Sequence, residues 1–149
     1  MRRHLFIGSL LTVFLVGGFF IFDALPKSIS GKKSELRLGG EVFEVDIAST
    51  PTERAQGLSG RPTLGQNEAM LFIFDQADYH GVWMKDMKFA LDIIWIKDDK
   101  IIGWQESAPP NDALARAIYY PPEPADKVLE ARAGTVARLG LKIDDIIKL

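Results

Sequence analysis

Short apolar runs separated by polar joints make up most of the chain after residue 34. The densest part is residues 70–96, where three apolar runs enclose the polar residues Lys85, Asp86 and Asp92. Residues 43–47 instead alternate between apolar and acidic positions. Alternation is typical of a strand with one buried face, and a short continuous apolar run is typical of a strand buried on both faces. The pattern therefore predicts a β-rich domain with a few polar groups held in its core.

Turn residues separate the predicted strands. Gly39 and Gly40 supply the positive φ of a tight hairpin turn, and Asp98 and Asp99 mark a second hairpin. The strands expected from these signals cover residues 35–38, 41–47, 69–74, 81–84, 90–97, 100–107, 127–132 and 141–149.

Two short helices are expected between the strands. Thr50 is a good N-cap, Pro51 suits the first helical position, Glu53 completes a capping box, and Gly57 ends the helix. Residues 134–140 form the second helix. Eight or so short strands with two short helices predict a mainly β, single-domain β-sandwich or irregular barrel, and argue against a βαβ protein.

The N-terminus has a different character. No charge occurs from Leu5 to Phe22, and at about 1.5 Å per residue this stretch spans roughly 27 Å, close to the thickness of a bilayer core. Arg2 and Arg3 precede it, which favours a cytoplasmic N-terminus with the remainder across the membrane. Residues 1–30 are thus expected to be a membrane anchor with a tether, or a signal peptide cleaved near Ser30, and residues 35–149 the β domain.

Charge and composition exclude several classes of function. Removing residues 1–30 takes away Arg2, Arg3, Lys27 and Asp23, which leaves 15 basic and 19 acidic residues and a net charge of −4. The charge of an acidic domain without a row of basic residues does not favour binding to nucleic acid. The chain has no cysteine, and His80 is its only histidine beyond the N-terminal segment, so neither a disulfide, a metal site nor a cofactor is expected.

Five segments occur in an order that resembles a known family: FEVDIASTPTERAQGLSGR, EAMLFIF, VWMKDMKFALDIIWI, ESAPP and VLEARAGTVARLGLKIDD. The family is catalogued as domain of unknown function 192. The resemblance implies a compact, jelly-roll-like β-sandwich, commonly with an N-terminal export signal, and no agreed activity. This chain departs from the family in two places. Asn111 and the following residues replace a pair of cysteines, and Asp86 and Met87 replace an Asn-Thr pair.

Four polar residues are candidates for ligand binding: Arg61, Lys85, Asp92 and Glu106. Asp92 lies within an apolar strand, and a buried carboxylate needs partners. It either belongs to a site with Lys85 or Arg61, or is a structural acceptor of backbone N–H groups from residues 85–89. Arg61 could likewise clamp an anionic ligand or pin its own loop.

Aromatic residues divide into two groups. The three tryptophans are expected in the core, and Tyr119 and Tyr120 are expected to be partly exposed.

The sequence therefore predicts a binding or interaction module of the cell envelope. Residues 5–22 are expected to contact the membrane, and the domain is expected to face the periplasm or the exterior. The sequence does not identify the ligand or protein partner, and no catalytic residue is assigned. The alternative is a small hydrolase or lyase acting on envelope polymers, with Asp92 and Glu106 as acid and base.

Overall fold

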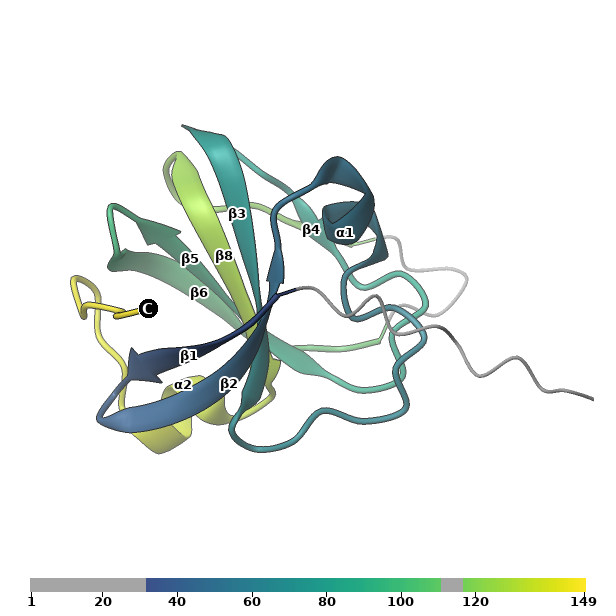
Figure 1. Cartoon of the computed structure of the whole chain (residues 1–149), viewed down its shortest axis with the longest axis horizontal. Helices are drawn as coiled ribbons and strands as arrows, with labels where there is room; N and C mark the ends of the chain where they lie inside the picture. Colours follow the sequence, from purple (N-terminus) through teal and green to yellow (C-terminus); the bar gives the residue numbers. More distant parts are fainter. Residues whose placement is uncertain (1–31, 111–116) are drawn as a thin grey trace, which may run out of the picture.

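The computed structural model describes residues 32–110 and 117–149, and these form a mixed six-stranded sheet with a separate two-stranded ribbon (Figure 1). The order across the main sheet is β1 (Lys33–Leu38), β2 (Glu41–Ala48), β3 (Glu68–Asp78), β8 (Ala125–Arg132), β5 (Leu91–Lys97) and β6 (Lys100–Ala108). The ribbon pairs β4 (Val82–Trp83) with β7 (Ile118–Tyr119), and the helices are α1 (Pro51–Gln56) and α2 (Thr135–Leu139). The prediction of a mainly β fold with two short helices is confirmed.

Both predicted hairpins form. Gly39 and Gly40 have φ of 56° and 84° between the antiparallel strands β1 and β2. Asp98 and Asp99 have φ of 49° and 63° between β5 and β6. Positive φ at both central positions matches the twist of the flanking strands, which is why glycine or aspartate is found there.

The connection from β2 to β3 differs from the expectation. The two strands are parallel, and α1 lies in the crossover between them, so the chain contains one local β-α-β unit. The capping box of α1 is as predicted, because Thr50 accepts from the Glu53 backbone and the Glu53 side chain accepts from the Thr50 and Ser49 backbone N–H groups. Alternation within a strand carries no information about pairing direction, and a crossover of this length permits parallel pairing.

Apolar side chains cover both faces of the sheet. The tail-side core lies under α2 and the C-terminal segment, and its larger members are Leu36, Leu38, Phe43, Val45, Leu71, Ile94, Ile96, Ile101, Leu129, Val136, Leu141 and Ile147. The loop-side core lies under residues 57–64 and 82–89, and its larger members are Leu58, Leu64, Met70, Phe72, Met84, Met87, Leu91, Ile93, Trp95 and Val128. β3 is buried on both faces from Ala69 to Phe72, as predicted, and Phe74 is only half-buried.

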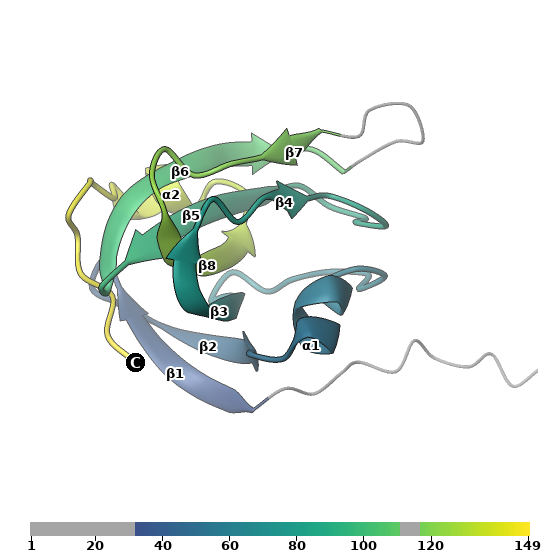
Figure 2. The same ribbon diagram turned by 90° about the horizontal axis from the view of Figure 1, so that it is seen from above.

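The C-terminal segment is not the regular strand expected over residues 141–149. It makes single bridges to both edge strands, from Lys148 to Arg37 of β1 and from Ile146 to Lys100 of β6. Backbone N–H groups of Arg37 and Ile101 donate to the carbonyls of Lys148 and Asp145, at 2.7 and 2.9 Å. This tail therefore joins the two edges of the curved sheet (Figure 2), which makes the domain closer to an irregular barrel than to a two-sheet sandwich or jelly roll.

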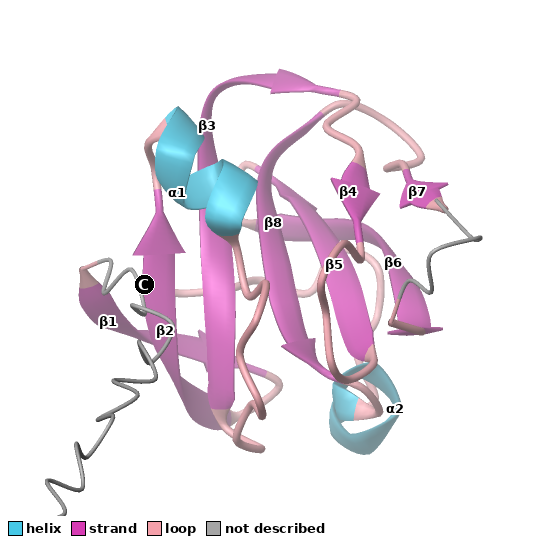
Figure 3. Ribbon diagram, turned by 90° about the vertical axis from the view of Figure 1, so that its right-hand side faces the viewer, coloured by secondary structure: helices cyan, strands magenta, loops and turns pink. Residues whose placement is uncertain are grey.

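Figure 3 shows α1 and the β4–β7 ribbon on the same side of the main sheet, and α2 at one end of β5. Within residues 32–110 and 117–149, no helix is long and apolar enough to cross a membrane. The segment from Leu5 to Phe22 lies outside the residues that the structure describes.

Candidate functional site

Asp92, the sharpest candidate from the sequence, is a completely buried acceptor of backbone N–H groups. Its Oδ1 accepts from Ser107 N and its Oδ2 from Val136 N, both at 2.8 Å. Gly134, the N-cap of α2, provides no side-chain acceptor, so Asp92 caps the first turn of this helix from β5. Among the described residues, Asp92 does not make the contact with Arg61 or Lys85 that a site would require. It is a structural acceptor of backbone N–H groups, but the donors are Ser107 and Val136 and not residues 85–89.

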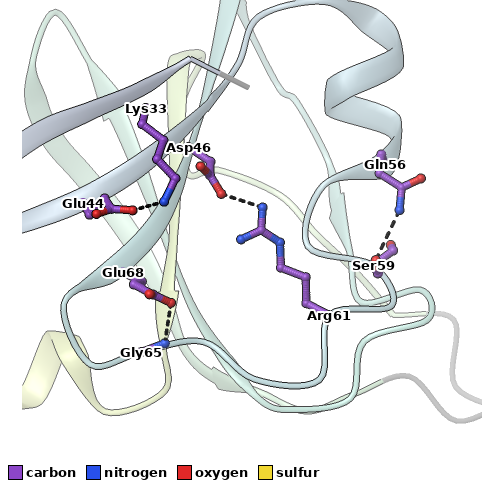
Figure 4. Close-up of polar contacts among 8 residues, drawn as sticks. All are labelled: Lys33, Glu44, Asp46, Gln56, Ser59, Arg61, Gly65 and Glu68. Atoms are coloured by element: carbon purple, nitrogen blue, oxygen red, sulfur yellow. Dashed lines mark hydrogen bonds and ion pairs between the residues drawn. The ribbon is translucent and has the colours of Figure 1, made fainter. Parts of the chain in front are cut away.

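Arg61 pairs with Asp46 on β2, with 2.5 Å between Nη2 and Oδ2 (Figure 4). Asp46 lies at an alternating position that the sequence assigns to solvent, yet the pair is mostly buried. Nearby, Glu68 accepts from the Gly65 backbone, and Lys33 pairs with Glu44. Arg61 thus pins the loop after α1 to the sheet, which is the second of the two roles expected for it, with Asp46 as the partner.

Lys85 and Glu106 have further, separate partners. Lys85 Nζ lies 5.4 Å from the centre of the Trp83 ring, and Glu106 accepts from Trp104 Nε1 at 3.1 Å. The four sequence candidates therefore have four different sets of contacts, and none of these contacts joins one candidate to another.

A cavity of about 130 Å³ lies between α1 and the sheet. One wall is formed by Arg54 and Ala55 of α1 and by residues 57–59, and the opposite wall by residues 81–83 together with Met87. The floor consists of Phe72 and Phe74 of β3 and Val128 and Glu130 of β8. The walls are partly polar, because Arg54, Gln56 and Ser59 line them, whereas the floor is apolar except for a single carboxyl group.

Glu130 reaches this floor by strand alternation. Leu129 and Ala131 face the tail-side core, so Val128 and Glu130 face the loop side. Met70 of β3 and Ile93 of β5 are directly opposite Glu130 on either side. Only 6% of Glu130 is exposed, and the described residues place no hydrogen bond or ion pair on its carboxyl group.

Burial raises the pKa of Glu130 to about 8, because the ionised carboxylate loses its hydration there. The group is therefore mostly protonated at neutral pH. A strongly perturbed carboxyl in a cavity is a typical mark of a functional site.

The rim of the cavity holds cations against aromatic rings. The Arg54 guanidinium lies 5.0 Å from the centre of the Phe74 ring, and its Nη1 donates to the carbonyls of Ile73 and Ser49. His80 stacks on Phe74 with 3.6 Å between ring centres. Trp83 is 54% exposed, so its expected place in the core is wrong: β4 is a two-residue surface strand whose ring lies at the mouth of the cavity.

The sequence analysis missed Glu130 as a candidate. Glu130 lies in the strand predicted over residues 127–132, where it shares its face with Val128. An acidic residue at an inward position of a strand is the same signal that selected Asp92.

Among residues 32–110 and 117–149, no group of three or more His, Asp or Glu side chains is arranged to hold a metal ion.

These features define the class: a mainly β domain with a small cavity that has a buried glutamate in its floor. The chain belongs to the domain of unknown function 192 family, whose model, described as "Uncharacterized ACR", matches residues 34–149. This confirms the resemblance seen in the sequence.

Two solved structures are similar over most of the chain. A protein of unknown function from Novosphingobium aromaticivorans is 29% identical with a TM-score of 0.75, covering 85% of this chain and 91% of that one. A "putative transcription regulator" from Sinorhizobium meliloti is 34% identical with a TM-score of 0.74, covering 80% of this chain and 95% of that one. Comparison with curated proteins finds no match.

Proposed function

We propose that the protein is a binding module of the cell envelope, tethered to the cytoplasmic membrane by residues 5–22, and that its β domain binds a small, largely apolar ligand in the Glu130 cavity. The observation that carries this proposal is the buried carboxyl group in a cavity floor whose other side chains, Phe72, Phe74 and Val128, are apolar.

The size of the cavity suits a ligand as large as one aromatic ring or one long side chain. An engineered apolar cavity of about 150 Å³ is known to bind benzene, and the Glu130 cavity measures about 130 Å³. Burying a carboxyl without a partner costs folding free energy. A ligand that contacts Glu130 would recover part of that cost, which is a physical reason for the arrangement.

The placement in the envelope rests on the sequence. The uncharged stretch from Leu5 to Phe22 follows Arg2 and Arg3, and a polar tether separates it from β1.

The name of the Sinorhizobium meliloti relative raises the question of DNA binding. The net charge of −4 beyond residue 30 does not favour it. Arg61 and Arg138 are also paired with Asp46 and Glu41, so these two arginines are not available to phosphates.

The alternative of a hydrolase that uses Asp92 and Glu106 is not favoured by the contacts of these residues. Asp92 is inaccessible and both of its oxygens accept backbone N–H groups, so it cannot reach a substrate.

Binding can be tested with the full chain in detergent and three small probes: benzylamine, benzyl alcohol and benzoate. At least one probe should shift the indole N–H signal of Trp83 and the amide signals of residues 57–59 in NMR spectra. Ala55→Trp should block these shifts, because Ala55 is an exposed residue of the cavity wall. Thr52→Trp, on the same helix but away from the cavity, is the matched control and should leave binding unchanged. If no probe shifts these signals, the cavity is not a binding site.

The tether is tested separately by fractionating cells that produce the full chain. The protein should sediment with membranes and be digested by protease added to spheroplasts. Recovery in the cytosol would disprove the envelope placement and leave the cavity result intact.

A further inference from the structure

We propose that the ligand of the Glu130 cavity is a small organic cation, an amine carried on an apolar or aromatic body. This inference rests on the proposed function and specifies the chemistry of its ligand.

The first argument is that no residue in the described part of the chain pairs with the carboxyl group. Glu130 lies between Met70 and Ile93 on the sheet, above Phe72 and Val128, and none of these side chains offers a hydrogen bond. A cation that reaches this carboxyl would form a charge-assisted pair at a group that is only 6% exposed.

The second argument concerns the charged groups that surround the cavity. Arg54 of α1 is held by the carbonyls of Ser49 and Ile73, and Lys85 after β4 lies over Trp83. His80 is stacked on Phe74 and contacts the carbonyl of Gln76. From β3 and β5, the residues facing this side are apolar. Arg54 and Lys85 thus have contacts of their own. Neither these two side chains nor His80 is hydrogen-bonded to Glu130.

The third argument is the aromatic lining. Phe72, Phe74 and Trp83 present rings to the cavity, and the negative faces of aromatic rings attract cations. Arg54 lies over the Phe74 ring and Lys85 over the Trp83 ring, so these two rings already attract positive charge at the rim. An ammonium group inside would have rings around it and the carboxyl below it.

Proton balance gives this proposal a distinctive signature. An ammonium group pairs with the ionised carboxylate, so the protonated Glu130 must release its proton to solvent on binding. With a pKa of about 8, affinity should rise roughly tenfold per pH unit between pH 6 and about pH 7.5. A neutral ligand would show no such rise.

The experiment compares benzylamine with benzyl alcohol and benzoate, using the full chain in detergent. Benzylamine should bind at least about tenfold more tightly than either at pH 8, and Glu130→Gln should abolish that preference. Calorimetry of the unaltered protein in two buffers of different ionisation enthalpy should show close to one proton released per benzylamine at pH 7. This second measurement holds even if the variant does not fold.

The outcomes separate the two proposals. If benzyl alcohol or benzoate binds in the cavity as tightly as benzylamine, the ligand class is wrong and the binding function stands; benzoate would point to Arg54 and Lys85 as the selecting groups. If benzylamine binds without proton release, or equally well to Glu130→Gln, the carboxyl is not its partner. If no probe reaches the cavity, both proposals fail.

Discussion

Two buried carboxyl groups on neighbouring strands have opposite environments. Asp92 of β5 receives two backbone N–H groups at 2.8 Å, so its negative charge is stabilised by the protein itself. Glu130 of β8 has no such donors among the described residues, and burial raises its pKa to about 8. Although both carboxyl groups are buried, Asp92 is a structural group, because it has donors, and Glu130 is a candidate binding group.

The first prediction concerns the pH dependence of stability. The pKa of Glu130 is about 8 in the folded protein against an ordinary value of 4.5. The folded state therefore binds more protons than the unfolded state between these values, and stability falls as pH rises through this window. The shift corresponds to roughly 5 kcal/mol at the most. Urea melts at pH 5 and pH 8 should show this fall, and Glu130→Gln should remove it.

The control for this measurement is Glu106→Gln, which changes an exposed glutamate and should keep the original pH dependence. An unchanged fall in Glu130→Gln would show that other groups cause it.

The second prediction concerns Asp92→Asn. An amide keeps the shape but turns one acceptor into a donor, which then faces a backbone N–H of Ser107 or Val136. Replacing one acceptor in this way should cost about 2–4 kcal/mol of unfolding free energy. Asp98→Asn, at an exposed turn position that asparagine accepts, should cost less than about 0.5 kcal/mol. Equal stability of both variants would exclude the capping role of Asp92.

At the scale of elements, local signals in the sequence predicted local structure well. The two hairpin turns and the capping box of α1 depend on residues within a few positions of one another, and all three are found. The parallel pairing of β2 with β3 depends on the path of the chain through space, which the alternation of side chains does not encode.

In the candidate site, too, local features could be predicted from the sequence, whereas contacts between distant residues could not. The burial of Asp92 could be read from Leu91 and Ile93 beside it, but its donors lie 15 and 44 positions away along the chain. The pairing of Arg61 with Asp46 joins residues 15 positions apart across a helix and a turn. Glu130 could have been selected by the criterion applied to Asp92. The cavity itself could not be predicted from the sequence, because α1, β3, β4 and β8 form it together.

The third prediction concerns the tail that joins β1 to β6. Ile147 is 2% exposed in the tail-side core, whereas its neighbour Ile146 is 56% exposed. Ile147→Ala should cost about 2–4 kcal/mol, since it opens a gap in a packed core. Ile146→Ala removes the same atoms from an exposed position and should cost less than about 0.5 kcal/mol. Similar losses for both variants in urea melts would show that the tail does not pack as described.

At the scale of the whole molecule, the β domain and the N-terminal segment are separate parts of the sequence. The family model begins at residue 34 and β1 begins at Lys33, well after the uncharged stretch ends at Phe22. The members of both cores that the structure describes all come after this point.

The fourth prediction follows from this separation. A chain that begins at residue 32 should be soluble and should unfold in one cooperative urea transition, as small single domains usually do. Its signals for Trp83 and residues 57–59 should match those of the full chain in detergent. Aggregation of the shortened chain, together with a folded full chain, would mean that the N-terminal segment belongs to the domain.

The contact of the tail with β1 also bears on how fast the domain folds. Arg138, just before the tail, pairs with Glu41 at a sequence separation of 97 positions, and Lys148 pairs with Arg37 over a still longer interval. Contacts between such distant segments form late, and domains rich in them fold in milliseconds to seconds. Until the tail arrives, β1 and β6 have open edges that can pair with other chains. Aggregation should therefore compete with folding mainly during refolding at high protein concentration, and much less once the native state has formed.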